Sequence, residues 1–68
     1  MLTIEKLLLD TEIIHDNTYI RIFDENNKLL YQDVWYTDRF TDFLEEEIKK
    51  LIYEPEKNRC QITVKKKD

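Results

Sequence analysis

The chain has 68 residues, of which 41% are hydrophobic and 38% charged, and its formal net charge is -4. A chain of this length holds one small hydrophobic core, so we expect a single domain over residues 1–68. The acidic balance argues against general affinity for nucleic acid or anionic membranes, because both attract positive charge. The chain has a single cysteine, which excludes an intramolecular disulfide. It also has a single histidine, so the roughly four Cys and His ligands of a structural zinc site are not available. No apolar run approaches the roughly 18 residues of a membrane span, so we expect a cytoplasmic protein.

The first segment, Thr3–Leu9, carries apolar residues at the i, i+3 and i+4 positions that form one face of a helix. Thr3 stands directly before the first of them, where its hydroxyl can cap a helix. We therefore predict a short helix. A strand is the alternative, because the run Leu7–Leu9 fits either structure.

Two runs rich in β-branched and aromatic residues, Thr18–Asp24 and Leu29–Tyr36, predict the strands of a β-hairpin. The chain has no glycine, so we expect Asn27 to adopt the left-handed backbone conformation that a three-residue hairpin loop requires. This register sets Asp24 across from Lys28, a favourable pair of opposite charges. A bulge of one residue would exchange the two faces of one strand.

The predicted hairpin is apolar on both faces. One face is aliphatic and suits the core; it consists of Ile20, Ile22, Leu30 and Val34. The other is aromatic and includes an arginine; it consists of Tyr19, Arg21, Phe23, Leu29, Tyr31 and Trp35. Tyrosine, tryptophan and arginine dominate binding surfaces, and large exposed apolar patches usually mark interfaces. We predict that this aromatic face binds a partner, unless residues 1–15 cover it as a second small core.

The stretch Asp38–Tyr53 predicts a long amphipathic helix. Its apolar residues fall on one helical stripe, and they are Phe40, Phe43, Leu44, Ile48, Leu51 and Ile52. Acidic residues precede lysines by four positions on the opposite side, which is the order that stabilises a helix. Pro55 disfavours helical backbone at the preceding residue, so we expect the helix to end there.

The last predicted strand, Arg59–Lys65, alternates between apolar and polar residues, with Cys60, Ile62 and Val64 on one side. Such alternation predicts a strand with one face on the core and the other in water. We therefore predict an α+β fold in the order α-β-β-α-β, in which a small antiparallel sheet packs on one long amphipathic helix.

No set of residues predicts catalysis. His15 lies beside Asp16, but a nucleophile and an oxyanion site are missing, so we expect an ordinary surface histidine in a turn. Cys60 lies on the inward side of a strand, where a free cysteine behaves as a small hydrophobic residue. We therefore expect no catalytic residue, no metal site, no cofactor and no enzymatic activity.

At the string TYIRIFDENNKLLYQDVW, preceded by TIEKLLLD, the chain resembles a loose class of short phage and mobile-element proteins from low-GC bacteria. Proteins of that class begin with a short helix followed by a hairpin, and Asn27 stands where they usually have glycine. The resemblance covers the first half of the chain and implies a hairpin, not a reaction. Some small acidic α+β phage proteins inhibit host defence nucleases by direct contact, which implies an inhibitor or regulator.

These observations predict a small non-enzymatic module that binds a protein partner through its aromatic face. Homodimerisation through the same face is one alternative. Weak binding of single-stranded nucleic acid is another, because aromatic and arginine side chains on a sheet can stack on bases. The acidic net charge argues against the nucleic-acid alternative.

Overall fold

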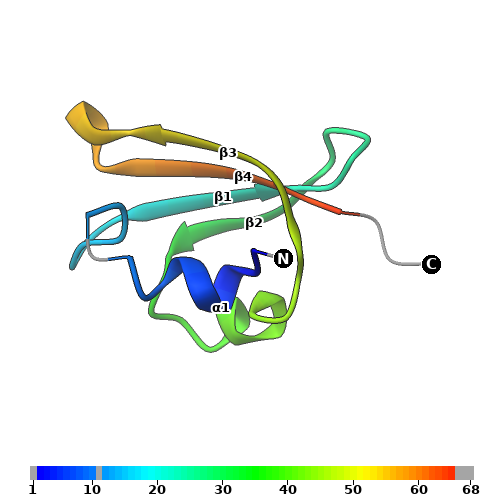
Figure 1. Cartoon of the computed structure of the whole chain (residues 1–68), viewed down its shortest axis with the longest axis horizontal. Coiled ribbons are helices and arrows are strands. Elements are labelled where there is room, and N and C mark those ends of the chain that lie inside the picture. Colours follow the sequence, from blue (N-terminus) through cyan, green and yellow to red (C-terminus); the bar gives the residue numbers. More distant parts are fainter. Residues whose placement is uncertain (1, 11, 66–68) are drawn as a thin grey trace.

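The computed structural model describes residues 2–10 and 12–65, which contain four strands and three short helical segments (Figure 1). The helical segments are α1 (Ile4–Leu7), η1 (Arg39–Phe43) and η2 (Pro55–Lys57), and the strands are β1 (Tyr19–Phe23), β2 (Leu29–Val34), β3 (Ile48–Glu54) and β4 (Arg59–Val64). The strands form one sheet in the order β2-β1-β4-β3. The two outer pairs are antiparallel, whereas the central strands β1 and β4 run parallel. The predicted antiparallel sheet is therefore wrong, and the fold is a small, mostly-β domain with a mixed sheet.

The long helix predicted over Asp38–Tyr53 is also wrong. Residues 39–43 form the 3-10 segment η1, and the chain then extends into β3, which pairs with β4 along the edge of the sheet. A bulge explains how a strand can imitate helical spacing. Ile48 pairs with Val64 and Leu51 with Ile62, and the register shifts in the interval between them. The extra residue puts two apolar side chains that are three positions apart on the same side of the strand.

Contacts distant in sequence hold this region in its extended form. The amide of Ile4 donates to the carbonyl of Glu46 at 3.1 Å, and the amide of Ile48 donates to the carbonyl of Leu2 at 2.8 Å. The N-terminal segment thus continues the sheet beside the start of β3. Helix propensity is a weak preference that such tertiary pairing overrides, and β-branched residues at 48 and 52 suit a strand.

A second bulge lies in the hairpin and changes the register that we predicted. Phe23 pairs with Leu29 as expected, but Ile22 pairs with Tyr31, because the register shifts between Ile22 and Phe23. Leu30 is the additional residue. From Tyr31 onward β2 is therefore turned over relative to the prediction, and Tyr31 faces the core.

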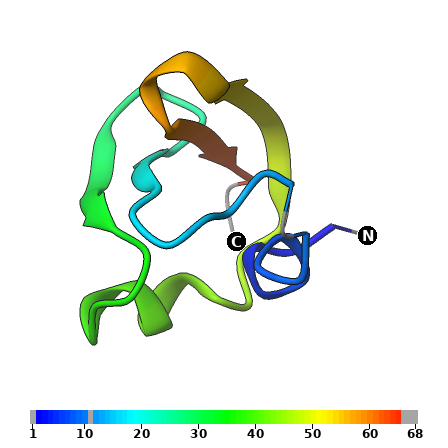
Figure 2. The same cartoon turned by 90° about the vertical axis from the view of Figure 1, so that its left-hand side faces the viewer.

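The core lies between the sheet and the layer formed by α1, η1 and the loop before β1. In the end-on view the sheet curves over α1 and η1, which lie on the same side of it (Figure 2). The buried apolar residues are Ile4, Leu7, Ile14, Ile20, Ile22, Tyr31, Phe40, Cys60, Ile62 and Val64. Since Ile4, Leu7 and Ile14 pack into this core, the N-terminal part of the chain does not roof the other face of the sheet.

Several local predictions are confirmed. The hydroxyl of Thr3 accepts a hydrogen bond from the amide of Lys6 at 3.3 Å and caps α1, although α1 has only four residues. Asn27 has a φ of 63°, and the carboxylate of Asp24 accepts from two amides of the same loop. Buried and partly exposed residues alternate along β4 as expected. No helix of the described residues is long and apolar enough to cross a membrane.

Candidate protein-interaction surface

Neither α1 nor η1 covers the other side of the sheet, and among residues 2–10 and 12–65 no further helix packs on it; we call this side the open face. Cross-strand pairing arranges its side chains in three rows that run from β2 through β1 and β4 to β3. The rows are Val34, Tyr19, Arg59 and Glu54; Gln32, Arg21, Gln61 and Ile52; and Leu29, Phe23, Thr63 and Lys50.

The two faces of the sheet differ sharply in exposure. On the core side, Ile20, Ile22 and Ile62 have no exposed surface, whereas no residue of the open face is buried. Leu29 and Ile52 are large aliphatic residues that are 41% and 39% exposed. Aliphatic and aromatic side chains left in water on a sheet of a small domain indicate a surface that a partner can cover.

Arg21 lies near the middle of the open face. Its Cζ atom is 5.2 Å from the centre of the Phe23 ring, within the range of a cation–π contact. Its Nε atom is buried and has no hydrogen-bond acceptor among the described residues. The strand places Tyr19 two positions before Arg21 and Phe23 two positions after it, so all three side chains share one side of β1.

The other arginine of the open face is paired. Arg59 contacts the carboxylate of Glu54 with Nη2 at 2.8 Å and Nε at 2.9 Å, which is a two-pronged interaction with one oxygen. This hydrogen bond, with the charges of Arg59 and Lys57, lowers the pKa of Glu54 from its ordinary value. The pair is partly exposed, so it is worth little to stability, but it neutralises one cation of the face.

A shallow hollow of about 200 Å³ lies beside the middle row of the open face. The hairpin loop and β3 form its sides, and an ion pair of 3.7 Å between Lys49 and Glu25 joins them. Gln61, Thr63 and Ile52 contribute to its lining. The hollow offers a place for one side chain of a partner over the β4–β3 part of the open face.

Of the six residues that we predicted for the binding face, four lie on the open face. They are Tyr19, Arg21, Phe23 and Leu29. Tyr31 does not, because the bulge turns it into the core, where it is 2% exposed. Its ring packs 5.5 Å from that of Phe40, and its hydroxyl donates to the carbonyl of Val34 at 2.6 Å and contacts the hydroxyl of Thr37.

Trp35 also lies away from the open face. Its indole Nε1 donates to the carbonyl of His15 at 2.7 Å, and its ring packs on the hydrophobic core and edge-on against Tyr36. Trp35 therefore fixes the loop that leads into β1. Its predicted place on the aromatic face of the hairpin is therefore wrong, because the strand ends at Val34 and the chain turns toward that loop.

The sequence reasoning missed Gln32, Arg59 and Ile52 as members of this surface. Arg59 and Gln61 lie on the polar side of the alternation that correctly predicted β4. The same alternation could therefore have identified them as part of the exposed surface. Ile52 could not be found in that way, because the apolar spacing assigned it to a helix. Gln32 reaches the open face only through the hairpin bulge.

The free edge of β2 is a weaker candidate for binding an added strand. Asp33 turns its carboxylate onto the amide of Val34 at 2.7 Å, so that a partner strand cannot use this donor freely. A charged residue and a bulge are the usual devices that protect edge strands from pairing. The open face of the sheet is the better candidate.

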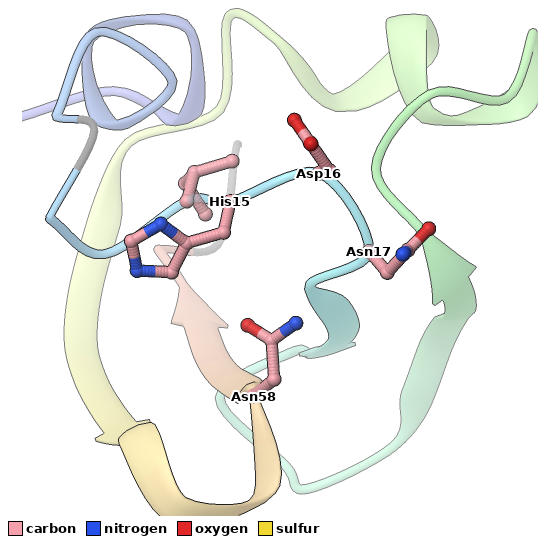
Figure 3. Close-up of a pocket in the computed structure, with 5 residues that line it drawn as sticks. His15, Asp16, Asn17 and Asn58 are labelled. Atoms are coloured by element: carbon pink, nitrogen blue, oxygen red, sulfur yellow. The ribbon is translucent and has the colours of Figure 1, made fainter.

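A second hollow, of about 370 Å³, lies at the end of the molecule where the loop before β1 meets the β3–β4 turn (Figure 3). Ile14, His15, Asp16, Asn17 and Asn58 line it. The side chains of His15 and Asp16 leave the loop in different directions, and Asn58 projects toward the loop from the turn (Figure 3). The Oδ1 atom of Asn58 already accepts from Thr18 at 2.8 Å, so this atom supports the fold.

Within the described part of the chain, no three or more His, Cys, Asp or Glu residues come together in a way that could hold a metal ion. Cys60 is fully buried, and burial raises the pKa of its thiol to about 12. Such a thiol stays protonated near neutral pH and is a poor nucleophile.

Comparison with known proteins gives no match to a family model, to a curated protein or to a solved structure. The resemblance of the hairpin region to short phage and mobile-element proteins therefore stays a prediction.

Proposed function

We propose that the protein is a small, non-enzymatic, cytoplasmic interaction module that binds a partner protein through the open face of its sheet. The observation that carries this proposal is the combination of Tyr19, Arg21 and Phe23 on an uncovered sheet face, flanked by the exposed aliphatic residues Leu29 and Ile52. Aromatic side chains and arginine contribute large contact areas and directional hydrogen bonds, and they carry much of the binding energy at protein interfaces.

Photo-crosslinking in a lysate of the organism that encodes the protein tests the proposal. Benzoylphenylalanine placed at Gln61 reports on the open face, and the same group at the exposed residue Glu12 serves as a control on another surface. We expect one protein adduct from position 61, and none of that mass from position 12. The substitutions Tyr19→Ala and Phe23→Ala together should abolish the adduct while leaving the circular dichroism spectrum unchanged.

The matched control is Leu9→Ala, which removes the most exposed large apolar side chain of the described residues, at 81%, without touching the open face. This variant should retain the adduct. Equal crosslinking from both positions, or an adduct that survives the double substitution, would contradict the proposal. An adduct consisting of a second copy of this chain, with concentration-dependent sedimentation of the purified protein, would instead show that the face serves homodimerisation.

A further inference from the structure

We propose that Arg21 is the recognition residue of the open face, and that it binds the carboxylate of an acidic segment of the partner protein. This inference rests on the proposed function and names the chemistry of the partner. Its starting point is the buried Nε atom of Arg21, which has no acceptor among the described residues. The described residues therefore leave part of the hydrogen-bonding capacity of this guanidinium group unused.

The surroundings of Arg21 prepare its guanidinium group for a carboxylate. The Phe23 ring lies 5.2 Å from Cζ and restricts the orientation of the guanidinium plane. The cross-strand neighbours of Arg21 are Gln32 and Gln61, whose side-chain amides are neutral and can donate hydrogen bonds. A carboxylate that approached the fork of the guanidinium would meet two parallel N–H donors there, which is the geometry that favours arginine over lysine.

Arg59 supplies an internal comparison on the same face. It already binds the carboxylate of Glu54, at 2.8 Å from Nη2, and so it does not need an acidic partner. Among residues 2–10 and 12–65, no carboxylate lies within ion-pair distance of Arg21. Of the two arginines on the open face, only Arg21 therefore has its charge available to a partner.

The charge of the surface agrees with an acidic partner. The three rows of the open face hold three cations, Arg21, Lys50 and Arg59, and one anion, Glu54, although the whole chain has a net charge of -4. Complementary charge steers and orients protein partners. Nucleic acid is the less favoured ligand, because its backbone requires more cations than this face offers and the acidic remainder of the chain repels it.

Nuclear magnetic resonance titration of the full-length, isotope-labelled chain tests the inference. The probes are a capped peptide of alternating glutamate and valine, the same peptide with glutamine in place of glutamate, and a single-stranded oligothymidine. We expect millimolar glutamate peptide to shift the Nε–Hε signal of Arg21 and the amide signals of β1 and β4. The glutamine peptide should bind at least about 10-fold more weakly, because it lacks the charge that strengthens such hydrogen bonds.

Three variants separate the role of Arg21 from that of general positive charge. Arg21→Gln should abolish binding of the glutamate peptide, and Arg21→Lys should weaken it, because lysine keeps the charge but not the planar fork. Lys6→Gln removes an exposed cation of α1, on the other side of the sheet, and should change the affinity less than about 3-fold, as exposed charges usually do. Each variant must keep the amide spectrum of the folded protein outside the open face.

Equal affinity for the glutamate and glutamine peptides, an unchanged Arg21 Nε–Hε signal, or absence of binding at millimolar peptide would overturn the inference. Tighter binding of oligothymidine would overturn it in favour of nucleic acid. If the crosslinked adduct from position 61 persists in Arg21→Gln, the open face still binds a protein and only the role of Arg21 is wrong. If that adduct is absent from the unmodified protein as well, the proposed function itself fails.

Discussion

The hydroxyl of Thr18 donates to the Oδ1 atom of Asn58 at 2.8 Å and thereby joins the start of β1 to the turn before β4. The same hydroxyl oxygen accepts from the amide of His15 at 2.7 Å, and Thr18 has no exposed surface. Asn58 has a φ of 48°, and its carbonyl accepts from the amide of Tyr19 at 3.0 Å. One buried threonine therefore aligns the two strands that run parallel at the centre of the sheet.

Thr18→Val should reduce the free energy of unfolding by about 1–3 kcal/mol, because valine keeps the shape but leaves the His15 amide and the Asn58 oxygen without their buried partner. Urea denaturation measures the effect. Thr63→Val is the matched control, since Thr63 lies partly exposed on the open face. It should change stability by less than about 0.5 kcal/mol. Similar losses for both variants would contradict the structural role of Thr18.

Tyr31 and Tyr19 should respond very differently to truncation, although both were predicted for one face. Tyr31→Ala removes a buried ring that packs against Phe40, and a loss of about 3–5 kcal/mol is typical of such sites. Tyr31→Phe keeps the ring and should cost about 1 kcal/mol for the lost hydrogen bond to the carbonyl of Val34. Tyr19→Ala, on the open face, should cost clearly less than Tyr31→Ala. A larger loss for Tyr19→Ala than for Tyr31→Ala in thermal or urea denaturation would contradict the position of Tyr31 in the core.

Residue 50 distinguishes a strand from the helix that the spacing predicted. Lys50 is exposed in β3 and pairs with Thr63 across the sheet. Threonine suits a strand and alanine suits a helix, and strand preferences span about 1 kcal/mol. We therefore expect the free energy of unfolding of Lys50→Thr to exceed that of Lys50→Ala by at least a few tenths of a kcal/mol. Greater stability of the alanine variant in urea denaturation would argue for the helix.

Cys60 should be unreactive in the folded protein. Burial raises the pKa of its thiol from 9.0 to about 12, so almost no thiolate is present at neutral pH. Ellman's reagent should react only as fast as the protein opens, and urea-unfolded protein should react at the rate of a free thiol. Because the pKa is higher in the folded state, stability should also fall as the pH rises above 9.0. Rapid labelling of the native protein would contradict the buried position.

Glu54 should contribute to the acid sensitivity of the protein. The hydrogen bond from Arg59, followed by the charges of Arg59 and Lys57, holds its pKa below the ordinary value of 4.5. A lowered pKa in the folded state stabilises the protein above pH 4.5, and this contribution is lost as the pH falls through the lowered value. Glu54→Gln should therefore be less stable than the unmodified protein at neutral pH. In urea denaturation at a series of pH values, the difference should shrink below pH 4.5. A difference that is independent of pH would show that the carboxylate does not act in this way.

Features that depend only on neighbouring residues follow directly from the amino-acid sequence. Thr3 caps α1, Asn27 takes the left-handed position in a loop without glycine, and the alternation along β4 separates its core side from its open side. Each of these follows from backbone conformation or side-chain parity within a few positions. The same local parity placed Tyr19, Arg21 and Phe23 together on a side of β1 that faces away from the core.

Three features depend instead on three-dimensional packing: the side of β2 that faces the core, the strand formed by residues 48–54, and the parallel pairing of β1 with β4. A bulge after Ile22 turns Tyr31 inward, and a bulge before Leu51 lets a strand carry the three-residue spacing of a helix. Bulges and strand pairing depend on contacts far apart in sequence, such as those between Leu2 and Ile48 and between Thr18 and Asn58. A single residue inserted into a strand exchanges its faces, and local patterns contain no information on whether distant packing favours it.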